Sequence, residues 1–76
     1  MVVAYVMAKA HTGDADRIKT DIDAVDGVVE SSIVAGDVDF IAEVEVDSPA
    51  AVKDVAASGI QEVDGIESTQ TYIAMD

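Results

Sequence analysis

Four segments of the chain have the apolar pattern of β-strands. Residues 2–10 form a nearly continuous apolar run that is rich in valine, and residues 28–35 are mostly β-branched or small. Apolar and polar residues alternate over residues 40–47, and residues 66–75 contain a further β-branched stretch. Short runs of this kind, bounded by Gly and Asp, are typical of strands. We therefore predict four strands.

The segment after the first strand repeats apolar residues at helical spacing. Residues that recur every three or four positions lie on one side of a helix. We expect a helix that is capped by Thr12 or Asp14, extends to about Val25 and is ended by Asp26-Gly27. Its apolar stripe comprises Ala15, Ile18, Ile22 and Val25.

A second helix is predicted after the third strand. Ser48 is a good helix cap, and Pro49 suits the first helical position because its missing N–H would have no partner there. Asp64-Gly65 ends this helix. Its apolar stripe comprises Val52, Val55, Ala56 and Ile60.

The second and third strands are predicted to form a hairpin. Gly36-Asp37 between them predicts a tight turn. Alternate residues of a strand point to opposite faces of the sheet. In the third strand one face carries Phe40, Ala42, Val44 and Val46, and the other carries Glu43, Glu45 and Asp47 beside Ile41.

The order of these elements is βαββαβ, and a short repeat supports it. Val25-Asp26-Gly27-Val28 recurs as Val63-Asp64-Gly65-Ile66. Two interleaved right-handed βαβ units form a ferredoxin-like α+β fold. We predict an antiparallel four-stranded sheet of order 4-1-3-2 with both helices on one face. The alternative is that two Asp-Gly turns match by chance, since this turn chemistry is common.

The predicted central first strand is apolar on both of its faces. Two helices on one side of a sheet leave the other side uncovered, so a second subunit is the simplest cover. The alternative is a face that tolerates small aliphatic residues in water. One face carries Val2, Ala4, Val6 and Ala8, and the other carries Val3, Tyr5 and Met7.

The chain is short, and its apolar residues are small. We interpret residues 1–76 as a single domain, which at this size buries only about 60% of its unfolded surface. The 13 Val and 12 Ala dominate the apolar half, while Leu, Trp and Cys are absent. Disulfide bridges are therefore excluded, and oligomerisation is the remaining way to stabilise so thin a core.

The formal net charge is -12, from 16 acidic and 4 basic residues, and it limits the classes of partner that we expect. Direct binding to nucleic acid needs a basic surface and is not expected. No segment resembles a membrane span or a signal peptide, so we predict a cytoplasmic protein. The acidity favours a halophilic, haloarchaeal source, because molar salt shortens screening to about 3 Å. The alternative is an ordinary acidic protein.

No group of residues predicts catalysis. His11 has no nucleophile near it in the sequence, and acids are so abundant that pairs such as Asp21 with Asp23 or Glu43 with Glu45 arise by chance. A phosphate-binding glycine loop is also absent from the sequence. We expect no enzyme activity, no cofactor and no metal site.

Two segments resemble the ligand-binding domain of the Lrp/AsnC family of feast/famine transcription regulators. The family pattern is a Gly-Asp-x-Asp-aromatic turn into the third strand, a helix, then Gly-(Val/Ile) and a Thr-x-Thr strand. Residues 35–40 read AGDVDF, residues 64–66 read DGI and residues 68–76 read STQTYIAMD. Each part is present in order, and the resemblance spans nearly the whole chain.

The resemblance implies an effector module that dimerises through its sheets, assembles into oligomers such as octamers and binds an amino acid between dimers. The family's helix-turn-helix does not precede the first strand in this sequence. We therefore expect a stand-alone module that acts on transcription through helix-turn-helix relatives.

The predicted ligand site combines the hairpin turn with the last strand. Asp37 or Asp39 can pair with an α-ammonium group, and the hydroxyls of two threonines can bind a carboxylate. Glycine in the turn permits close backbone approach. Ordinary turn and strand chemistry explains the same residues without a ligand. The predicted site residues are Gly36, Asp37, Asp39, Thr69, Thr71 and Tyr72.

Other functions fit the same fold class. A ligand-free interaction module needs no site, and ACT-type domains also bind amino acids. A small dimeric α+β barrel monooxygenase shares the topology but needs an aromatic cavity, for which Tyr5, Phe40 and Tyr72 are few.

Overall fold

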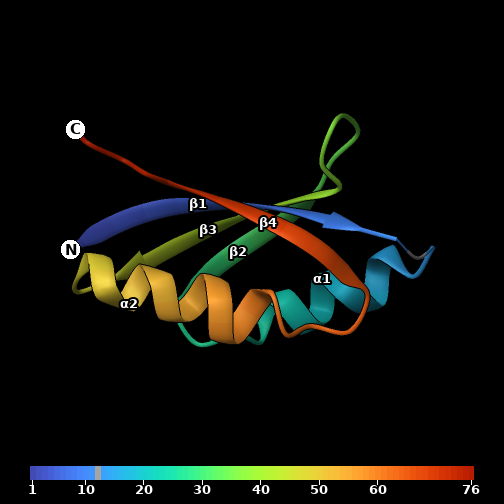
Figure 1. The fold of residues 1–76 in the computed structure, drawn as a ribbon, viewed down its shortest axis with the longest axis horizontal. Coiled ribbons are helices and arrows are strands. Elements are labelled where there is room, and N and C mark those ends of the chain that lie inside the picture. The colour runs from blue at the N-terminus through green and yellow to red at the C-terminus, as the bar shows by residue number, and fades with distance from the viewer. Residues whose placement is uncertain (12) are drawn as a thin grey trace.

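The computed structural model describes residues 1–11 and 13–76. The element order confirms the predicted βαββαβ pattern (Figure 1). The strands are β1 (Val2–Ala10), β2 (Val28–Ile33), β3 (Phe40–Val46) and β4 (Ile66–Ile73). The helices are α1 (Ala15–Asp23), α2 (Pro49–Asp54) and a π-helix, η1 (Val55–Ile60), that continues α2.

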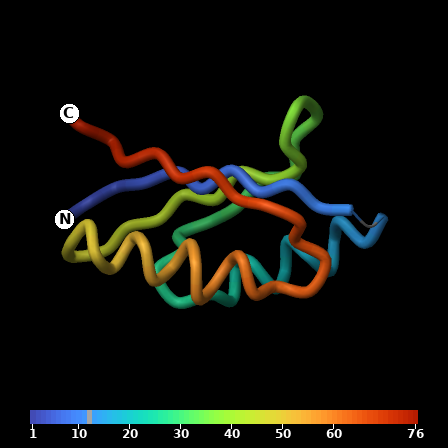
Figure 2. Tube along the Cα trace, viewed as in Figure 1, coloured from blue at the N-terminus to red at the C-terminus, as the bar shows by residue number. Residues whose placement is uncertain are grey.

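The four strands form one antiparallel sheet of order β2-β3-β1-β4, which is the predicted order. Both helices lie on one face of this sheet, and the other face is left open (Figure 1). The two ends of the chain lie at the same end of the sheet (Figure 2). The ferredoxin-like α+β fold predicted from the repeat is confirmed.

The core lies between the sheet and the helices, on the predicted faces. Phe40, the largest buried side chain, is 1% exposed. Alternation along β1 and β3 places every second residue in this layer, because side chains of a strand point to opposite faces. The buried residues of the layer include Ala4, Val6, Ala8, Ile18, Ile22, Phe40, Ala42, Val44, Val52 and Ile60.

The two Asp-Gly turns are structural equivalents. Gly27 and Gly65 have φ of 99° and 100°, which only glycine adopts easily. In each turn the residue after glycine donates its N–H to the residue before Asp, at 3.1 Å. The glycine carbonyls then accept from the other half of the chain, Gly27 from Glu45 and Gly65 from His11. The sequence repeat therefore marks the two crossing points of the interleaved halves.

Several predicted boundaries differ from those observed. The first helix ends at Asp23 rather than Val25, and Asp14 makes no side-chain cap bond, while Thr12 lies outside the described residues. Ser48 does cap its helix by accepting from the Ala51 N–H at 3.2 Å. The hairpin connection is longer than a two-residue turn, since Val34 N–H closes it by donating to the Asp39 carbonyl.

The second helix is not uniformly α-helical. Its last part, η1, takes the wider π-helical form, which the spacing of apolar residues does not distinguish. Gly59 in η1 packs directly against Val25, where a Cβ atom would collide with the valine side chain. This contact brings the second helix close to the end of the first.

Candidate functional site

The loop between β2 and β3 is tied to β1 through Asp39. Its backbone N–H donates to the Ala8 carbonyl at 3.0 Å, and its carboxylate Oδ2 accepts from the Ala10 N–H at 2.9 Å. The pairing of β1 with β3 ends at Ala8 and Phe40, so the Asp39 carboxylate gives the Ala10 amide the acceptor that the β3 backbone no longer provides. Asp39 therefore stabilises an irregular end of β1 in this chain.

Asp37 lies in the same loop and lines a hollow of about 500 Å³ beside the start of β4. The loop projects from the side of the sheet opposite to the helices (Figure 1). Lys9 and Thr69 line the same hollow, so a carboxylate and an ammonium group lie along one hollow. The remaining lining residues are Met7, Val38, Ser68 and Gln70.

Thr69 and Thr71 share one face of β4, as alternation predicts, and that face points toward the second helix. They pair with Ala8 and Val6, whose side chains are buried under the helices. Thr69 Oγ1 donates to Gln61 Oε1 at 3.1 Å. Both threonines line a second hollow of about 390 Å³, whose other residues are Pro49, Val52, Lys53, Ala56, Ala57, Gln61 and Ile73.

The six predicted site residues are thus distributed over four places. Asp37 and Thr69 share one hollow, and Gly36 precedes Asp37 in the loop. Thr71 lies in the second hollow, and Asp39 is bonded to β1. Tyr72 pairs with Tyr5 on the open face and points away from the threonines. Within one chain they do not form a single cluster.

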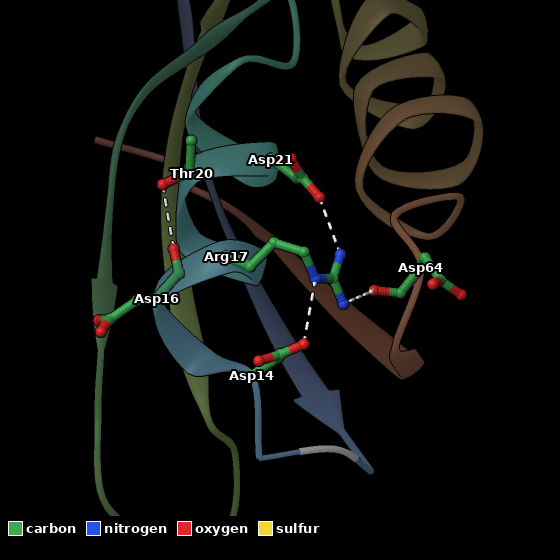
Figure 3. A network of polar contacts seen from close by, with 6 residues as sticks. All are labelled: Asp14, Asp16, Arg17, Thr20, Asp21 and Asp64. Atoms are coloured by element: carbon green, nitrogen blue, oxygen red, sulfur yellow. Dashed lines mark hydrogen bonds and ion pairs between the residues drawn. The ribbon is translucent and has the colours of Figure 1, made fainter.

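The lysines beside these hollows were not identified from the sequence. The other two basic residues lie on α1, where Lys19 binds Asp23 at 2.7 Å and Arg17 binds Asp21 at 2.9 Å. Arg17 also donates to the Asp64 carbonyl at 2.9 Å, which fastens α1 to the second Asp-Gly turn (Figure 3). Among the described residues, neither Lys9 nor Lys53 forms an ion pair. A ligand carboxylate can pair with either one.

A third hollow, of about 940 Å³, lies at the end of the sheet away from the hairpin loop. It is lined by the first Asp-Gly turn, the end of β3 and the second helix, including Asp26, Glu45, Asp47 and Asp54. Four carboxylates repel an anionic ligand. Over the described residues no group of three or more metal-ligating side chains has the arrangement of an ion site.

The open face of the sheet is amphipathic. Tyr5 is 39% exposed and Tyr72 is 55% exposed, and both lie in one row with Glu43 of β3. Loss of hydration raises the pKa of the Glu43 carboxyl, and the negative charges of Glu45 and Glu30 raise it further. The open face therefore presents aromatic rings beside carboxylates whose negative charges repel one another.

None of the described helices is both long enough and apolar enough to cross a membrane. The described helices instead serve as the cover for one face of the sheet.

The fold closely matches solved structures. The protein TTHA0845 from Thermus thermophilus superposes with a TM-score of 0.92 at 26% identity, over 100% of this chain and 95% of that one. AsnC from E. coli gives 0.88 at 24% identity, over 99% of this chain and 51% of that one. The regulator NMB0573 from Neisseria meningitidis, solved as a complex with L-Met, gives 0.84 at 12% identity, over 99% and 50%.

A comparison with curated protein sequences gives no match. The model of the Lrp/AsnC ligand binding domain matches residues 3–76, which is nearly the entire sequence. The matched range includes the hairpin loop and β4, where the hollow with Asp37 and Thr69 lies. The chain belongs to the Lrp/AsnC ligand-binding domain family.

Proposed function

We propose that residues 1–76 act as a stand-alone amino-acid-sensing domain, which forms homo-oligomers in the cytoplasm and modulates transcription through DNA-binding relatives. Family membership supports a ligand-binding and regulatory role. A structural relative was solved with L-Met, which makes a free amino acid the natural ligand class. The proposal assigns no catalytic step, cofactor or direct nucleic-acid contact to the chain.

The observation that carries this function is the hollow beside the hairpin. A free amino acid needs a partner for its ammonium group and one for its carboxylate, and Asp37 and Lys9 offer these opposite charges along one hollow. Among sixteen acids, a lysine at this place gives the site an anion partner that most of the surface lacks.

The remaining predicted site residues are proposed to come together between neighbouring copies in the oligomer. A loop that projects from the open side of the sheet can meet β4 of a neighbouring copy, and thereby bring Gly36 and Asp39 near a neighbour's Thr71 or Tyr72. A ligand held between copies changes the oligomer equilibrium by its differential affinity for the two states. We propose a dimer through the open face and assembly of dimers, up to an octamer.

The test is light-scattering chromatography in molar KCl, with and without a pool of the twenty amino acids. We expect a change in mass on addition, and dividing the pool then identifies the ligand. Calorimetry with the same pool detects binding that leaves the mass unchanged. Constant mass together with no heat at millimolar amino acid would refute the sensor function.

A ligand-free assembly module is the second candidate function. The hydrogen bond from the Ala10 N–H to the Asp39 carboxylate favours it, because that bond explains the second Asp of the turn without any ligand. Oligomers that bind none of the amino acids would support this function.

A further inference from the structure

The second hollow, between the second helix and β4, has one charged side chain in its lining, and that charge is positive. Lys53 lines this hollow, and no Asp or Glu is among the described residues around it. The hairpin hollow contains Asp37 beside Lys9, and the third hollow contains four carboxylates. In a chain with 16 acidic and 4 basic residues, a hollow with this charge is suited to an anion.

Lys53 lacks the kind of ion pair that the basic residues of α1 form. Both of those residues bind an aspartate four positions later on the same helix. The position four residues after Lys53 is Ala57, and the adjacent Asp54 lines the third hollow instead. Within the described part of the chain, the Lys53 ammonium group therefore has three donors and no acceptor.

Gln61, on the same hollow, also has donors to offer. Thr69 Oγ1 donates to Gln61 Oε1 at 3.1 Å, so the acceptor oxygen of this amide is already engaged. No described residue accepts a hydrogen bond from Gln61 Nε2, which carries two N–H groups. An amide in this state complements an oxygen of a ligand rather than an N–H group.

The rest of the lining is mostly apolar. Val52 and Ala56 are each at most 7% exposed. Ile73 pairs with the buried Ala4 on the covered face of the sheet, yet it is 40% exposed. The volume of about 390 Å³ lies within the range of about 300–1,000 Å³ that small-molecule sites occupy. A short aliphatic chain in this hollow would remove apolar surface from water.

We propose that the second hollow binds an α-keto acid with a short branched aliphatic chain. The ligand carboxylate pairs with the Lys53 ammonium group, the keto oxygen accepts from the Gln61 amide, and the aliphatic chain lies against Ala56 and Ile73. An amino acid of the same skeleton carries an ammonium group in place of the keto oxygen. The hollow offers that group no carboxylate, and Lys53 repels it. This site is complete within one chain and is separate from the amino-acid site in the hairpin hollow.

Calorimetry on the full chain in molar KCl tests this with three probes that share one carbon skeleton. Ketoleucine has the keto oxygen, isocaproate has hydrogen in its place, and leucine has the ammonium group. We expect ketoleucine to bind, and isocaproate to bind several-fold more weakly because it gives the amide no acceptor. Equal affinity of the two would overturn the role of the keto oxygen, and no heat from ketoleucine at millimolar concentration would overturn the proposal.

Lys53→Gln removes the positive charge of the hollow and should weaken ketoleucine binding at least about tenfold. Lys19→Gln is the matched control, because it makes the same change of charge on α1, away from the second hollow. This control should keep the affinity of the original chain. An unchanged affinity in Lys53→Gln, or equal losses in the two variants, would overturn the site.

A second pair of variants tests the hollow by adding a charge. Ala57 lines the second hollow and the next residue, Ser58, lines the third, and both are exposed, so circular dichroism should show that each variant keeps its fold. Ala57→Glu gives Lys53 a carboxylate four residues later and should abolish ketoleucine binding. Ser58→Glu adds the same charge and should leave binding unchanged. Retained binding in Ala57→Glu would place the ligand elsewhere.

Failure of this site is distinct from failure of the sensor function. Ketoleucine has no ammonium group, so its binding does not depend on Asp37, and the pool of amino acids tests the sensor separately. Any binding of leucine should be insensitive to Lys53→Gln. Leucine binding that this variant weakens as much as ketoleucine binding would show that the hollow accepts an ammonium group, which would overturn the proposal. Thr71 is unchanged in all four variants, because the proposed amino-acid site also includes it.

Discussion

The two faces of the sheet are built by the same four strands but differ in exposure and in the side chains that they carry. The face under the helices carries residues such as Val6, Phe40 and Val44, each at most 1% exposed. The open face carries Tyr5 and Tyr72 between polar and charged neighbours. The covered face therefore stabilises the single chain, while the open face remains exposed to solvent.

Strand β4 shows the same contrast within one element. Thr69 and Thr71 face the helices and line hollows, while Gln70 and Tyr72 alternate with them on the open face. An edge strand of this kind has two uses, since its covered side can hold a small molecule and its open side can hold a protein. This difference predicts that substitutions on the covered side and on the open side of β4 change different measured quantities.

The largest expected effect is on the covered face. Phe40→Ala should lower the free energy of unfolding by about 3–5 kcal/mol, because it opens a cavity in a core of small residues. Urea denaturation in molar KCl, followed by circular dichroism, measures this. A loss below about 1 kcal/mol would show that the helices do not close the layer tightly.

The next effect is on the open face. Ile41→Glu places a further carboxylate beside the row that already holds Glu30 and Glu43. It should raise the dimer dissociation constant about a hundredfold, because like charges across an interface cost several kcal/mol. Sedimentation equilibrium measures the constant. The monomer should keep its fold, since Ile41 is on the face away from the core. Equal dimer affinity would show that partners bind elsewhere.

A smaller effect is expected for the ligand. Thr71→Val is nearly isosteric and removes one hydroxyl, so it should weaken amino-acid binding about tenfold and leave the unfolding midpoint unchanged. Calorimetry with the identified amino acid measures the affinity. Equal affinity in the variant would remove Thr71 from the site, while Asp37→Asn separately tests the hairpin hollow.

The smallest effect is the pH dependence of stability, which has opposite signs on the two sides of the sheet. Hydrogen bonds from Lys19 and then Ser31 lower the pKa of Asp23. Its contribution to stability is present above the ordinary aspartate pKa and is lost as the pH falls through the lowered value. The raised pKa of Glu43 means that stability decreases as the pH rises from the ordinary glutamate pKa through the raised one.

Urea midpoints between about pH 3 and about pH 7 measure both slopes. Asp23→Asn should remove the loss at acid pH, and Glu43→Gln should remove the decrease at higher pH. If Glu43→Gln left the slope unchanged, the crowding of carboxylates on the open face would have no energetic consequence.

Most of the fold follows from local patterns. Alternation in residues 40–47 and the helical stripe around Ile18 and Ile22 predict which side chains are buried, and the Asp-Gly repeat supports the predicted order of the elements. These patterns depend on neighbours within a few positions, so they are readable one segment at a time. The π-helical turn and the length of the hairpin loop depend on packing, and local patterns do not predict them.

The candidate site is less predictable for the same reason. The residues of the turn and of β4 that resemble the family pattern were identified from the sequence. Their distribution over two hollows and the open face depends on the strand register, which the sequence pattern does not give. Lys9 and Lys53 carry no local signal, because a lysine on a strand or a helix is ordinary. They become candidates only through the residues that the fold places beside them.

By itself, the sequence determined the elements, the two chemically different faces of the sheet and the acidic character of the surface, because side-chain period and composition are local properties. Only the tertiary structure decided that Asp39 is bonded to Ala10, that Asp37, Lys9 and Thr69 line one hollow, and that two glutamates and two tyrosines share one row across the sheet. These relations join residues far apart in the chain. Their physical cause is the register of four strands, which is set by the whole core at once.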